Sequence, residues 1–440
     1  MESGELRQRD SGMTRAWQQP SESASRSLAG PELCVAWSEA PVPTLELAAP
    51  PAFVLRSGAL DLSASGEALR LSGEGALRLA ARARVTFRRP LPVALPGPFV
   101  AVLPFSGGAG LGTSWQGFTA PTAVAPELMM FRDGARWFAV SFAPAAAGLQ
   151  RAEASLEAAL ARMASRAPLA EAPALAAAPQ DDPTARPRWV ALVERALLSI
   201  ARGDLQKVVL ARALDVGLSA PPSPQQLCAA LARRFPTCRT FWLQGQGAAF
   251  AGASPETLAV VEHGRVRCDA LAGTAAPGGP LLGLDKELRE HRAVVDDLRA
   301  SLAPLADSID AAQVPKVLSL ANVDHLHTEV SARLRPGADI ADVAEALHPT
   351  SAVAGTPRPA ALRFIAEHEG LDRGLYAGLV GLVGPGRSEL HVALRSALLR
   401  GASARLFVGA GIVAGSDPLA EWEETQLKAQ ALLGALGGGR

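Results

Sequence analysis

The fold is decided at Gly203-Asp-Leu-Gln-Lys-Val-Val-Leu-Ala-Arg212. Before this stretch, residues 189–201 carry apolar side chains at helical spacing, which predicts a helix. Gly203 follows its last turn and predicts its end, because glycine enters the left-handed conformation of a helix C-terminus without strain. The apolar run at 207–211 then predicts a strand.

Working outward, strands and helices follow one another without the regular alternation of a doubly wound sheet. Strand pairs are expected around the Gly-Gln-Gly turn at 245–247 and around Glu262-His-Gly-Arg265. Helices are expected at 152–163, 285–303, 340–347, 359–369 and 419–436. Further strands are expected at 68–71, 99–103, 137–140, 317–335, 377–383, 391–399 and 404–411. This mixture indicates an α+β fold.

Composition excludes several classes of protein. The 440 residues carry 43 basic and 43 acidic side chains, so no basic excess predicts nucleic-acid binding. Hydrophobic residues make up 48%, which suits a packed core. No apolar run approaches the roughly 20 residues that span a bilayer, and the N-terminus has no secretory signal. A cytoplasmic protein with no membrane partner is expected, and its 4 cysteines are expected to be free thiols.

The clearest break in the chain is an Ala/Pro-rich linker at 166–187. It separates an N-terminal part, residues 31–165, from a C-terminal region, residues 188–440. Residues 1–30 are polar and are expected to be a disordered tail. The length alone allows either two to three domains or one large domain.

Two predicted helices each present two carboxylates on one face, three residues apart: Glu287 and Glu290 on the first, and Glu421 and Glu424 on the second. Oxygen ligands of this kind suit Mg²⁺, which is often held by one or two carboxylates together with water and substrate. Lys428 shares the second face. The spacing alone fits two solvated helix faces equally well.

Two single residues are candidates for acid–base chemistry. Lys207 opens an apolar strand, and burial there would lower its pKa and make it a usable base. An exposed strand edge would explain it as well. Glu256 follows a strand that must turn at Ser-Pro, and this turn could aim it into a cleft as a general acid. The alternative is a surface carboxylate of a turn.

Glycines beside predicted strands offer close backbone approach to a ligand, at Leu271-Ala-Gly273-Thr274 and at Val408-Gly409-Ala-Gly411. Neither stretch has the residues of a phosphate loop or of a dinucleotide fingerprint. His348 is a possible hydrogen-bond donor, or a core histidine. Arg395, on a predicted strand, is a possible carboxylate clamp.

These stretches, in this order, resemble the chorismate-utilising enzymes, which include the isochorismate, salicylate, anthranilate and aminodeoxychorismate synthases. The similarity covers about residues 189–436. Its blocks are Gly203–Arg212, Gly252-Ala-Ser-Pro-Glu256, Leu271-Ala-Gly-Thr274, Asp285-Lys-Glu-Leu-Arg-Glu-His291, Leu347-His-Pro-Thr-Ser351, Leu375-Tyr-Ala-Gly-Leu-Val-Gly381, and Phe407–Val413 running on to Glu421-Trp-Glu-Glu424.

The resemblance implies which nucleophile the chain uses. Lys207 stands where the isochorismate and salicylate synthases carry a lysine that activates water, and Ala272 replaces the nucleophilic lysine of aminodeoxychorismate synthase. The expected activity is therefore that of an isochorismate synthase, an isomerase (EC 5.4.4.2) of menaquinone or siderophore biosynthesis. The alternatives are a salicylate synthase, which goes on to eliminate pyruvate, and a non-catalytic subunit of an aminotransferring complex.

The resemblance also implies roles for the candidate residues. Lys207 would be the base and Glu256 the acid, while Glu287, Glu290, Glu421 and Glu424 would hold Mg²⁺. Residues expected to bind chorismate are Gly273, Thr274, His348, Tyr376, Arg395, Gly409, Gly411 and Lys428.

The implied fold is one large aminodeoxychorismate synthase-like domain, with two face-to-face antiparallel sheets and helices outside. Its N-terminal strands would join those sheets. Residues 188–440 would form the chorismate-binding catalytic region of a monomer without a glutaminase subunit.

Overall fold

The structure is a computed structural model. It describes residues 29–40, 52–56, 61–73, 75–105, 113–118, 121–164, 176–180, 182–275, 278–319 and 324–437. The expected tail at 1–30 therefore lies outside the described residues, except for its last two positions.

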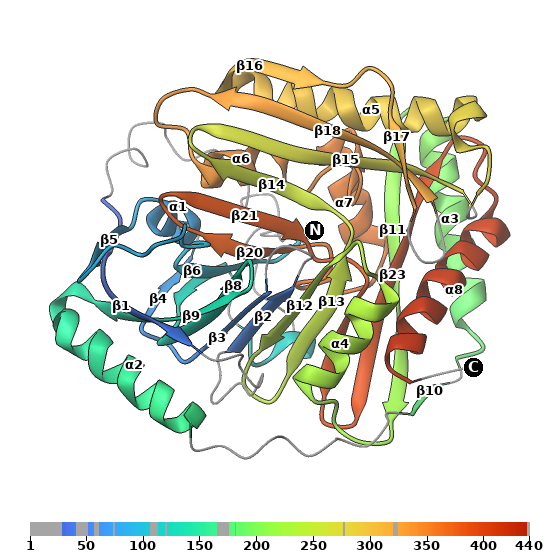
Figure 1. The fold of residues 1–440 in the computed structure, drawn as a ribbon. Helices are drawn as coiled ribbons and strands as arrows, with labels where there is room; N and C mark the ends of the chain where they lie inside the picture. The colour runs from blue at the N-terminus through green and yellow to red at the C-terminus, as the bar shows by residue number, and fades with distance from the viewer. Residues whose placement is uncertain are drawn as a thin grey trace, which may run out of the picture.

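Two large sheets form the body of the molecule (Figure 1). Among the described residues the first sheet has 13 strands, all in antiparallel pairs except for the parallel pair of β1 with β5. Its order is β10 (Ala177–Pro179), β11 (Lys207–Leu218), β23 (Ser403–Val413), β22 (Ser396–Arg400), β13 (Ala249–Ser254), β12 (Arg239–Gln244), β2 (Ala52–Arg56), β3 (Asp61–Ser65), β8 (Leu128–Asp133), β9 (Arg136–Pro144), β1 (Glu32–Ala40) and β5 (Arg84–Phe87), with β19 (Gly355–Thr356) beside β11.

The second sheet has 10 strands within the same described ranges. Its order is β16 (Ala306–Ala311), β18 (Asp324–Leu334), β15 (Arg265–Ala275), β14 (Thr257–Glu262), β21 (Arg387–Val392), β20 (Leu379–Val383), β6 (Phe99–Leu103), β7 (Thr122–Ala125) and β4 (Leu69–Ser72), with β17 (Lys316–Ser319) beside β18. The main core cluster contains side chains of both sheets, among them Phe241 and Phe407 of the first and Phe99 and Leu390 of the second. Burying these faces against each other removes apolar surface from water, which is the main force that holds the sheets together.

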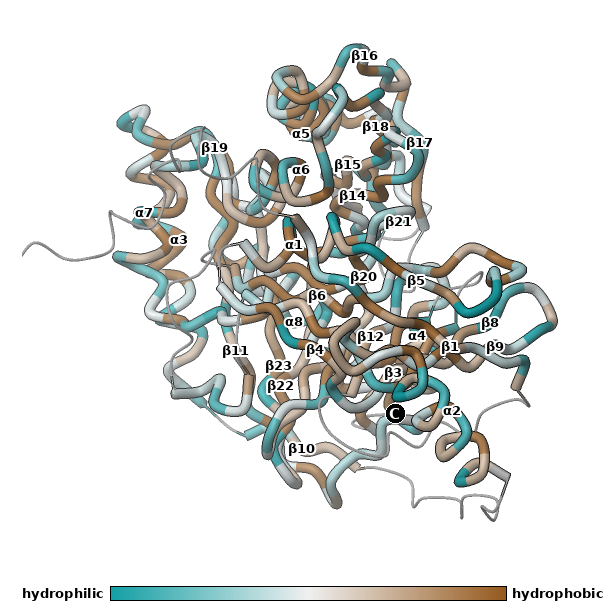
Figure 2. The backbone as a smooth tube through the Cα atoms, turned by 90° about the vertical axis from the view of Figure 1, so that its left-hand side faces the viewer, coloured by the Kyte–Doolittle hydropathy of each residue, from teal (hydrophilic) through white to brown (hydrophobic). Residues whose placement is uncertain are grey.

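Helices cover the sheets, as expected for an α+β fold. They are α1 (Ala76–Ala81), α2 (Gly148–Ala164), α3 (Ala185–Ala201), α4 (Pro224–Arg234), α5 (Asp285–Leu302), α6 (Ile340–Leu347), α7 (Arg358–His368) and α8 (Pro418–Ala435), with single turns at Thr113–Trp115, Ala145–Ala147, Leu281–Gly283 and Ala303–Leu305. A second core cluster joins α4 and α8 to the first sheet. In Figure 2 the apolar residues follow the central strands β6 and β20. No helix in the described ranges combines the length and apolarity needed to span a membrane.

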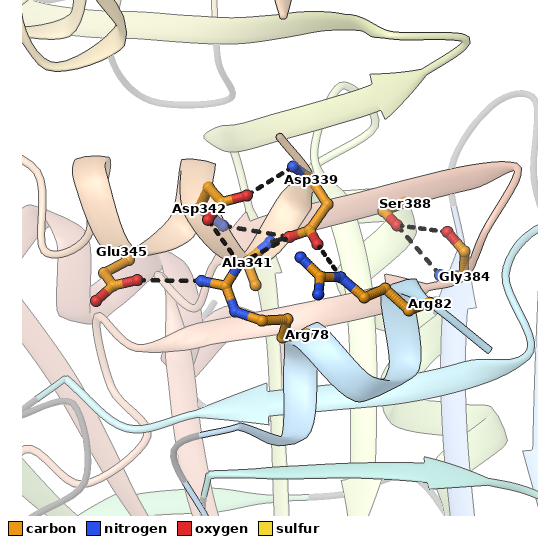
Figure 3. Close-up of polar contacts among 8 residues, drawn as sticks. All are labelled: Arg78, Arg82, Asp339, Ala341, Asp342, Glu345, Gly384 and Ser388. Atoms are coloured by element: carbon orange, nitrogen blue, oxygen red, sulfur yellow. Dashed lines mark hydrogen bonds and ion pairs between the residues drawn. The ribbon is translucent and has the colours of Figure 1, made fainter. Parts of the chain in front are cut away.

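The N-terminal strands belong to the same two sheets as the rest of the chain, so the molecule is one domain. Strand β2 pairs with β12, and β6 pairs with β20. Figure 3 shows Arg78 of α1 and Arg82, directly after it, reaching the start of α6. Arg78 Nη1 lies 2.6 Å from Asp342 Oδ1, and Arg82 Nε lies 3.2 Å from Asp339 Oδ2. The expected linker at 166–187 contains β10 and the start of α3.

The prediction of one strand over 391–399 is wrong, and the difference matters for function. Strand β21 of the second sheet ends at Val392, and β22 of the first sheet begins at Ser396. The chain crosses from one sheet to the other between them. Arg395 takes a φ of 47° in this crossing, a conformation that is uncommon for residues other than glycine.

Candidate active site

A cavity of about 190 Å³ opens where strands of both sheets meet the first turns of α5 and α8. Most of the candidate residues line it: Lys207, Glu256, Gly273, Glu287, Glu290, Tyr376, Arg395, Gly409, Gly411, Glu421, Glu424 and Lys428. Segments more than 200 positions apart in the chain thus converge on one space.

Two neighbouring crossings between the sheets shape one wall of this cavity. The first runs from β13 to β14 through Pro255 and Glu256, and the second runs from β21 to β22 through Arg395. Backbone bonds tie them together: Val392 N–H donates to Glu256 O at 3.1 Å, and Ala253 N–H donates to Arg395 O at 3.2 Å. The segments that carry Glu256 and Arg395 therefore lie next to each other.

Glu256 is built to hold a proton. It is 3% exposed, and burial, followed by the negative charge of Asp269, raises its pKa to about 8. A hydrogen bond from Thr350 and the positive charge of Lys207 act in the opposite direction. Near neutral pH this carboxyl is therefore mostly protonated, which suits a general acid.

Lys207 begins β11 and is 9% exposed, so of the two alternatives left open by the sequence it is the buried one. Its Nζ donates to Glu290 Oε1 of α5 at 2.6 Å. Across the sheet, β23 leaves room for this side chain at Gly411, where an added Cβ would lie 3.1 Å from Lys207 Cε. The side chain is thus held between a carboxylate and a glycine.

The acidic end of the cavity carries Glu287 and Glu290 from α5 and Glu421 and Glu424 from α8. Lys207 pairs with Glu290, and Lys428 pairs with Glu424 at 2.7 Å. Four carboxylates against two lysines leave a formal excess of two negative charges, which together with the oxygen donor set fits a divalent hard cation with water ligands. As the side chains stand, no three His, Cys, Asp or Glu in the described part of the chain form a ligand group.

Other residues of the lining offer groups that bind anions. Arg395 donates to Cys238 Sγ at 3.3 Å, and its guanidinium lies 5.2 Å from the ring centroid of Phe235. Tyr376 stacks on Phe407, with 5.3 Å between ring centroids, and burial raises its hydroxyl pKa to about 12. A protonated hydroxyl and a guanidinium both donate hydrogen bonds to a carboxylate. Lys428 Nζ also donates to Gly409 O at 2.9 Å.

Of the two remaining candidates, only His348 has a described side chain, and it does not line the cavity. His348 follows α6 as a buried residue, 3% exposed, and does not line the cavity wall. Burial lowers its pKa to about 3, so the ring is neutral, as in a core histidine. Thr350, two positions later, makes the contact with Glu256 instead, at 3.5 Å. Thr274 lies in β15, but its side chain is outside the described residues.

Sequence reasoning missed several residues around the cavity. His325 of β18 lines it, with a pKa lowered to about 3 by burial and then by the charges of Lys428 and Arg395. Arg373 also lines it. Asp269 lies behind Glu256 and accepts from His327 at 2.9 Å. The alternation of His325, Leu326 and His327 on a predicted strand was the available signal, since it puts the two imidazoles on one face.

Comparison with protein families gives one match over most of the chain. The family described as chorismate binding enzyme matches residues 91–437. The salicylate biosynthesis isochorismate synthase of Pseudomonas aeruginosa is 40% identical over 275 residues, which are 59% of this chain and 58% of that protein. The isochorismate synthase MenF of Escherichia coli is 40% identical over 255 residues, 56% of this chain and 59% of that protein. These alignments span less than two thirds of either relative.

Solved structures match over a longer range. The structure of MenF, the menaquinone-specific isochorismate synthase from Escherichia coli, has a TM-score of 0.77 at 30% identity and covers 93% of this chain and 95% of its own. Anthranilate synthase component I from Streptococcus pneumoniae has a TM-score of 0.71 at 23% identity, covering 91% of this chain and 92% of its own. The second likeness is one of fold.

Proposed function

Because the chain belongs to the family of chorismate-binding enzymes, we propose that it is an isochorismate synthase, which isomerises chorismate to isochorismate. The observation that carries this proposal is the pairing of a buried lysine with a protonated carboxyl on one cavity. Lys207 and Glu256 both line this space, and Glu256 has a pKa of about 8. A base and an acid in one site suit a reaction that adds water at one carbon and removes a hydroxyl from another.

Lys207, in its unprotonated form, takes a proton from a water molecule. The water oxygen forms a bond to ring carbon 2 of chorismate while the ring double bonds shift. Glu290, which holds Lys207 Nζ at 2.6 Å, and Gly411 opposite keep this amine in place. Fixing the base in this way reduces the entropy cost of reaching the transition state.

Glu256 donates its proton to the 4-hydroxyl, whose bond to the ring breaks so that it leaves as water. One water molecule enters and one departs, so the atoms balance. Lys207 then carries the extra proton, and exchange with solvent restores both side chains. The same two groups can run the reaction backwards, so we expect a reversible reaction.

We further propose that Glu287, Glu290, Glu421 and Glu424 hold Mg²⁺, directly or through water. The ion would supply positive charge against a substrate carboxylate. Arg395 and the Tyr376 hydroxyl would bind the enolpyruvyl carboxylate, together with the backbone near Gly409. Lys428 is held by Glu424 and by Gly409 O. Its positive charge would lie between the proposed Mg²⁺ site and the site for the enolpyruvyl carboxylate.

The deciding experiment incubates the purified chain with chorismate and MgCl₂ and follows the products by HPLC. Isochorismate should appear without added ammonia. Lys207→Ala should lower kcat by about 10²- to 10⁴-fold, the usual effect of losing a general base, while the circular dichroism spectrum stays unchanged. No consumption of chorismate by the wild-type chain would refute the proposed activity, and a near-wild-type rate in Lys207→Ala would refute the assigned base.

The same incubation tests the salicylate synthase alternative. A coupled lactate dehydrogenase assay detects pyruvate, and fluorescence detects salicylate. We expect neither, and their appearance would identify the second reaction. The relatives' names connect isochorismate formation to both menaquinone and salicylate, so the neighbouring genes decide the pathway. The cytoplasmic location, the monomeric state and the independence from a glutaminase subunit stay predictions.

A further inference from the structure

The strand that carries Lys207 is supported unequally along its two edges. One edge of β11 pairs with β23 from Lys207 to Gly217. The other edge pairs with β19 only at Lys207 and Val208, and with β10 only from Val216 to Leu218. In the described part of the chain no strand lies along this second edge between those two segments. A strand edge without partners leaves backbone groups unpaired, which is costly when they are buried.

A buried ion pair takes the place of the missing strand. Glu369 Oε2 accepts from Ala211 N–H at 2.8 Å, and Arg373 Nη2 donates to Val209 O at 2.7 Å. The two side chains bind each other through two contacts, Nε to Oε1 at 2.7 Å and Nη2 to Oε2 at 2.6 Å. The pair thus supplies one acceptor, Glu369 Oε2, and one donor, Arg373 Nη2. They bind Ala211 N–H and Val209 O of β11, as the backbone groups of a neighbouring strand would.

The same guanidinium holds one more segment of the cavity wall, and the backbone carbonyl of Arg373 holds another. Arg373 Nη1 donates to Val353 O at 3.0 Å, and Arg373 O accepts from Tyr376 N–H at 2.8 Å. Its carbon Cζ lies 4.3 Å from the ring centroid of Phe105. The Arg373 and Glu369 side chains are 3% and 0% exposed. Four of the five N–H donors of Arg373 are used within the protein, so this group is committed to the scaffold although it lines the cavity.

We propose that Glu369 and Arg373 are positioning residues. They hold the first residues of β11, and with them Lys207, in register with the loop that carries Tyr376. The proposal rests on the proposed function for its kinetic consequence only. Because Val209 lies two residues after Lys207 on the same strand, a shift of this stretch moves the base. Misplacing a reacting group by about 1 Å can cost about 10²-fold in rate.

Two variants test the pair. Arg373→Lys keeps the positive charge but loses the planar guanidinium. A single ammonium group cannot make the four hydrogen bonds that the guanidinium donates. The double variant Glu369→Gln/Arg373→Met removes both charges together and so avoids an unpaired buried charge. For both we expect kcat for chorismate to fall about 10- to 100-fold with KM within about threefold. We also expect faster hydrogen exchange, measured by mass spectrometry, in the peptide covering 204–213.

The matched control is Arg405→Lys, which alters an ion pair between β23 and the far part of β11, where Arg405 Nε lies 2.7 Å from Asp215 Oδ1. We expect wild-type kcat and wild-type exchange at 204–213. Unchanged kcat and exchange in both test variants would overturn the proposal. A raised KM with unchanged kcat would also overturn it, since Arg373 would then bind substrate directly.

Loss of the circular dichroism spectrum in both test variants would overturn the proposal as well, because the pair would then be required by the whole fold. If the wild-type chain does not convert chorismate, the proposed function fails on its own. The exchange of peptide 204–213 still decides whether the pair holds the strand.

Discussion

Glu256 shows how one side chain acquires its chemistry from its surroundings. An ordinary carboxyl is ionised at neutral pH, but this one lies at a sheet crossing without solvent and near the charge of Asp269. Its proton is available because the charged form is poorly solvated there. The same physical cause should make the proposed activity sensitive to pH on the alkaline side.

The first prediction concerns that sensitivity. Because the acid acts in its protonated form and its pKa is about 8, kcat should fall as pH rises through about 8, by about tenfold per pH unit above it. Steady-state rates between pH 6 and 10 measure this decrease, the alkaline limb of the pH profile. In Glu256→Gln the overall rate should be lower by about 10²- to 10⁴-fold. A flat rate from pH 7 to 10 in the wild-type chain would contradict the assignment of the acid.

The second prediction concerns Asp269. Its negative charge raises the pKa of Glu256, so Asp269→Asn should lower that pKa and move the alkaline limb of kcat to lower pH. The amide oxygen can still accept from His327, but the amide nitrogen cannot accept from Thr257 N–H as Asp269 Oδ2 does at 3.1 Å. Asp204→Asn, at an exposed ion pair with Arg202, is the control and should leave the limb where it is. A limb that stays in place in Asp269→Asn would show that burial alone sets the pKa of Glu256.

At this scale the sequence predicted much of the site. Glu256, Lys207 and the four glutamates were recognised because their motifs match those of the family in order, whereas their spacing alone fitted solvated side chains as well. Arg373 was not, because it binds the backbone of Val209, 164 positions away, and Asp269 was not, because its effect on Glu256 depends on burial in the fold. His348 was expected at the binding site and is buried outside the cavity lining, since a buried histidine cannot be told from a binding one without knowing what surrounds it.

Strand β23 is an element whose glycines serve the site. At Gly411 an added Cβ would lie 3.1 Å from the end of the flexible Lys207 side chain, whereas at Gly409 it would lie 2.6 Å from Leu210 O. The first contact can be relieved by moving a side chain, but the second requires moving backbone. Substitutions at the two glycines should therefore have different effects, one on the position of the Lys207 side chain and the other on the backbone of the sheet.

The third prediction follows from this difference. Gly411→Ala should fold with a free energy of unfolding within about 1 kcal/mol of wild type, while displacement of Lys207 lowers kcat by about tenfold or more. Urea unfolding and steady-state kinetics measure the two quantities. Gly217→Ala is the control, because its Cβ would meet only Ala178 O at 3.9 Å. A Gly411→Ala enzyme with wild-type kcat would show that Lys207 does not depend on this space.

Elements with strong periodicity were predicted closely, and those defined by tertiary structure were not. Helix α6 was expected at 340–347 and is found at Ile340–Leu347. The expected strand at 391–399 is instead two strands in two sheets, because Arg395 leaves extended geometry where the sheets cross. No local pattern marks such a crossing, since the apolar residues run through it. Strands β2 and β3 lack a clear signal because they are short, 5 residues each.

At the scale of the molecule, the N-terminal part is held by both backbone pairing and charge. Arg78 has a side chain that is 15% exposed and lies near three carboxylates of α6 and its cap, Asp339, Asp342 and Glu345. Removing the arginine would leave these carboxylates facing one another. Length alone left two to three domains and one large domain both open, and the family resemblance anticipated the single domain that this integration forms.

The fourth prediction tests that connection. Arg78→Gln should lower the free energy of unfolding by about 1–3 kcal/mol, less than for a fully buried pair because water reaches the partners. Unfolding in urea should remain a single transition, and kcat at 25 °C should stay unchanged, because α1 does not contact the cavity. Arg136→Gln, at an exposed pair with Glu39, is the control and should change stability by less than about 0.5 kcal/mol. Two separate transitions in the wild-type chain would contradict a single domain.

The pairing of β6 with β20 has a consequence for how the protein is made. Leu103 pairs with Leu379, 276 positions later in the chain. A ribosome adding about 5–20 residues per second needs about 15–55 s to cover that distance. Throughout this time β6 lacks β20 as its partner, and the sheet cannot close before Leu379–Val383 has been synthesised. During synthesis, the early strands therefore have unpaired edges that are open to chaperones and to neighbouring nascent chains.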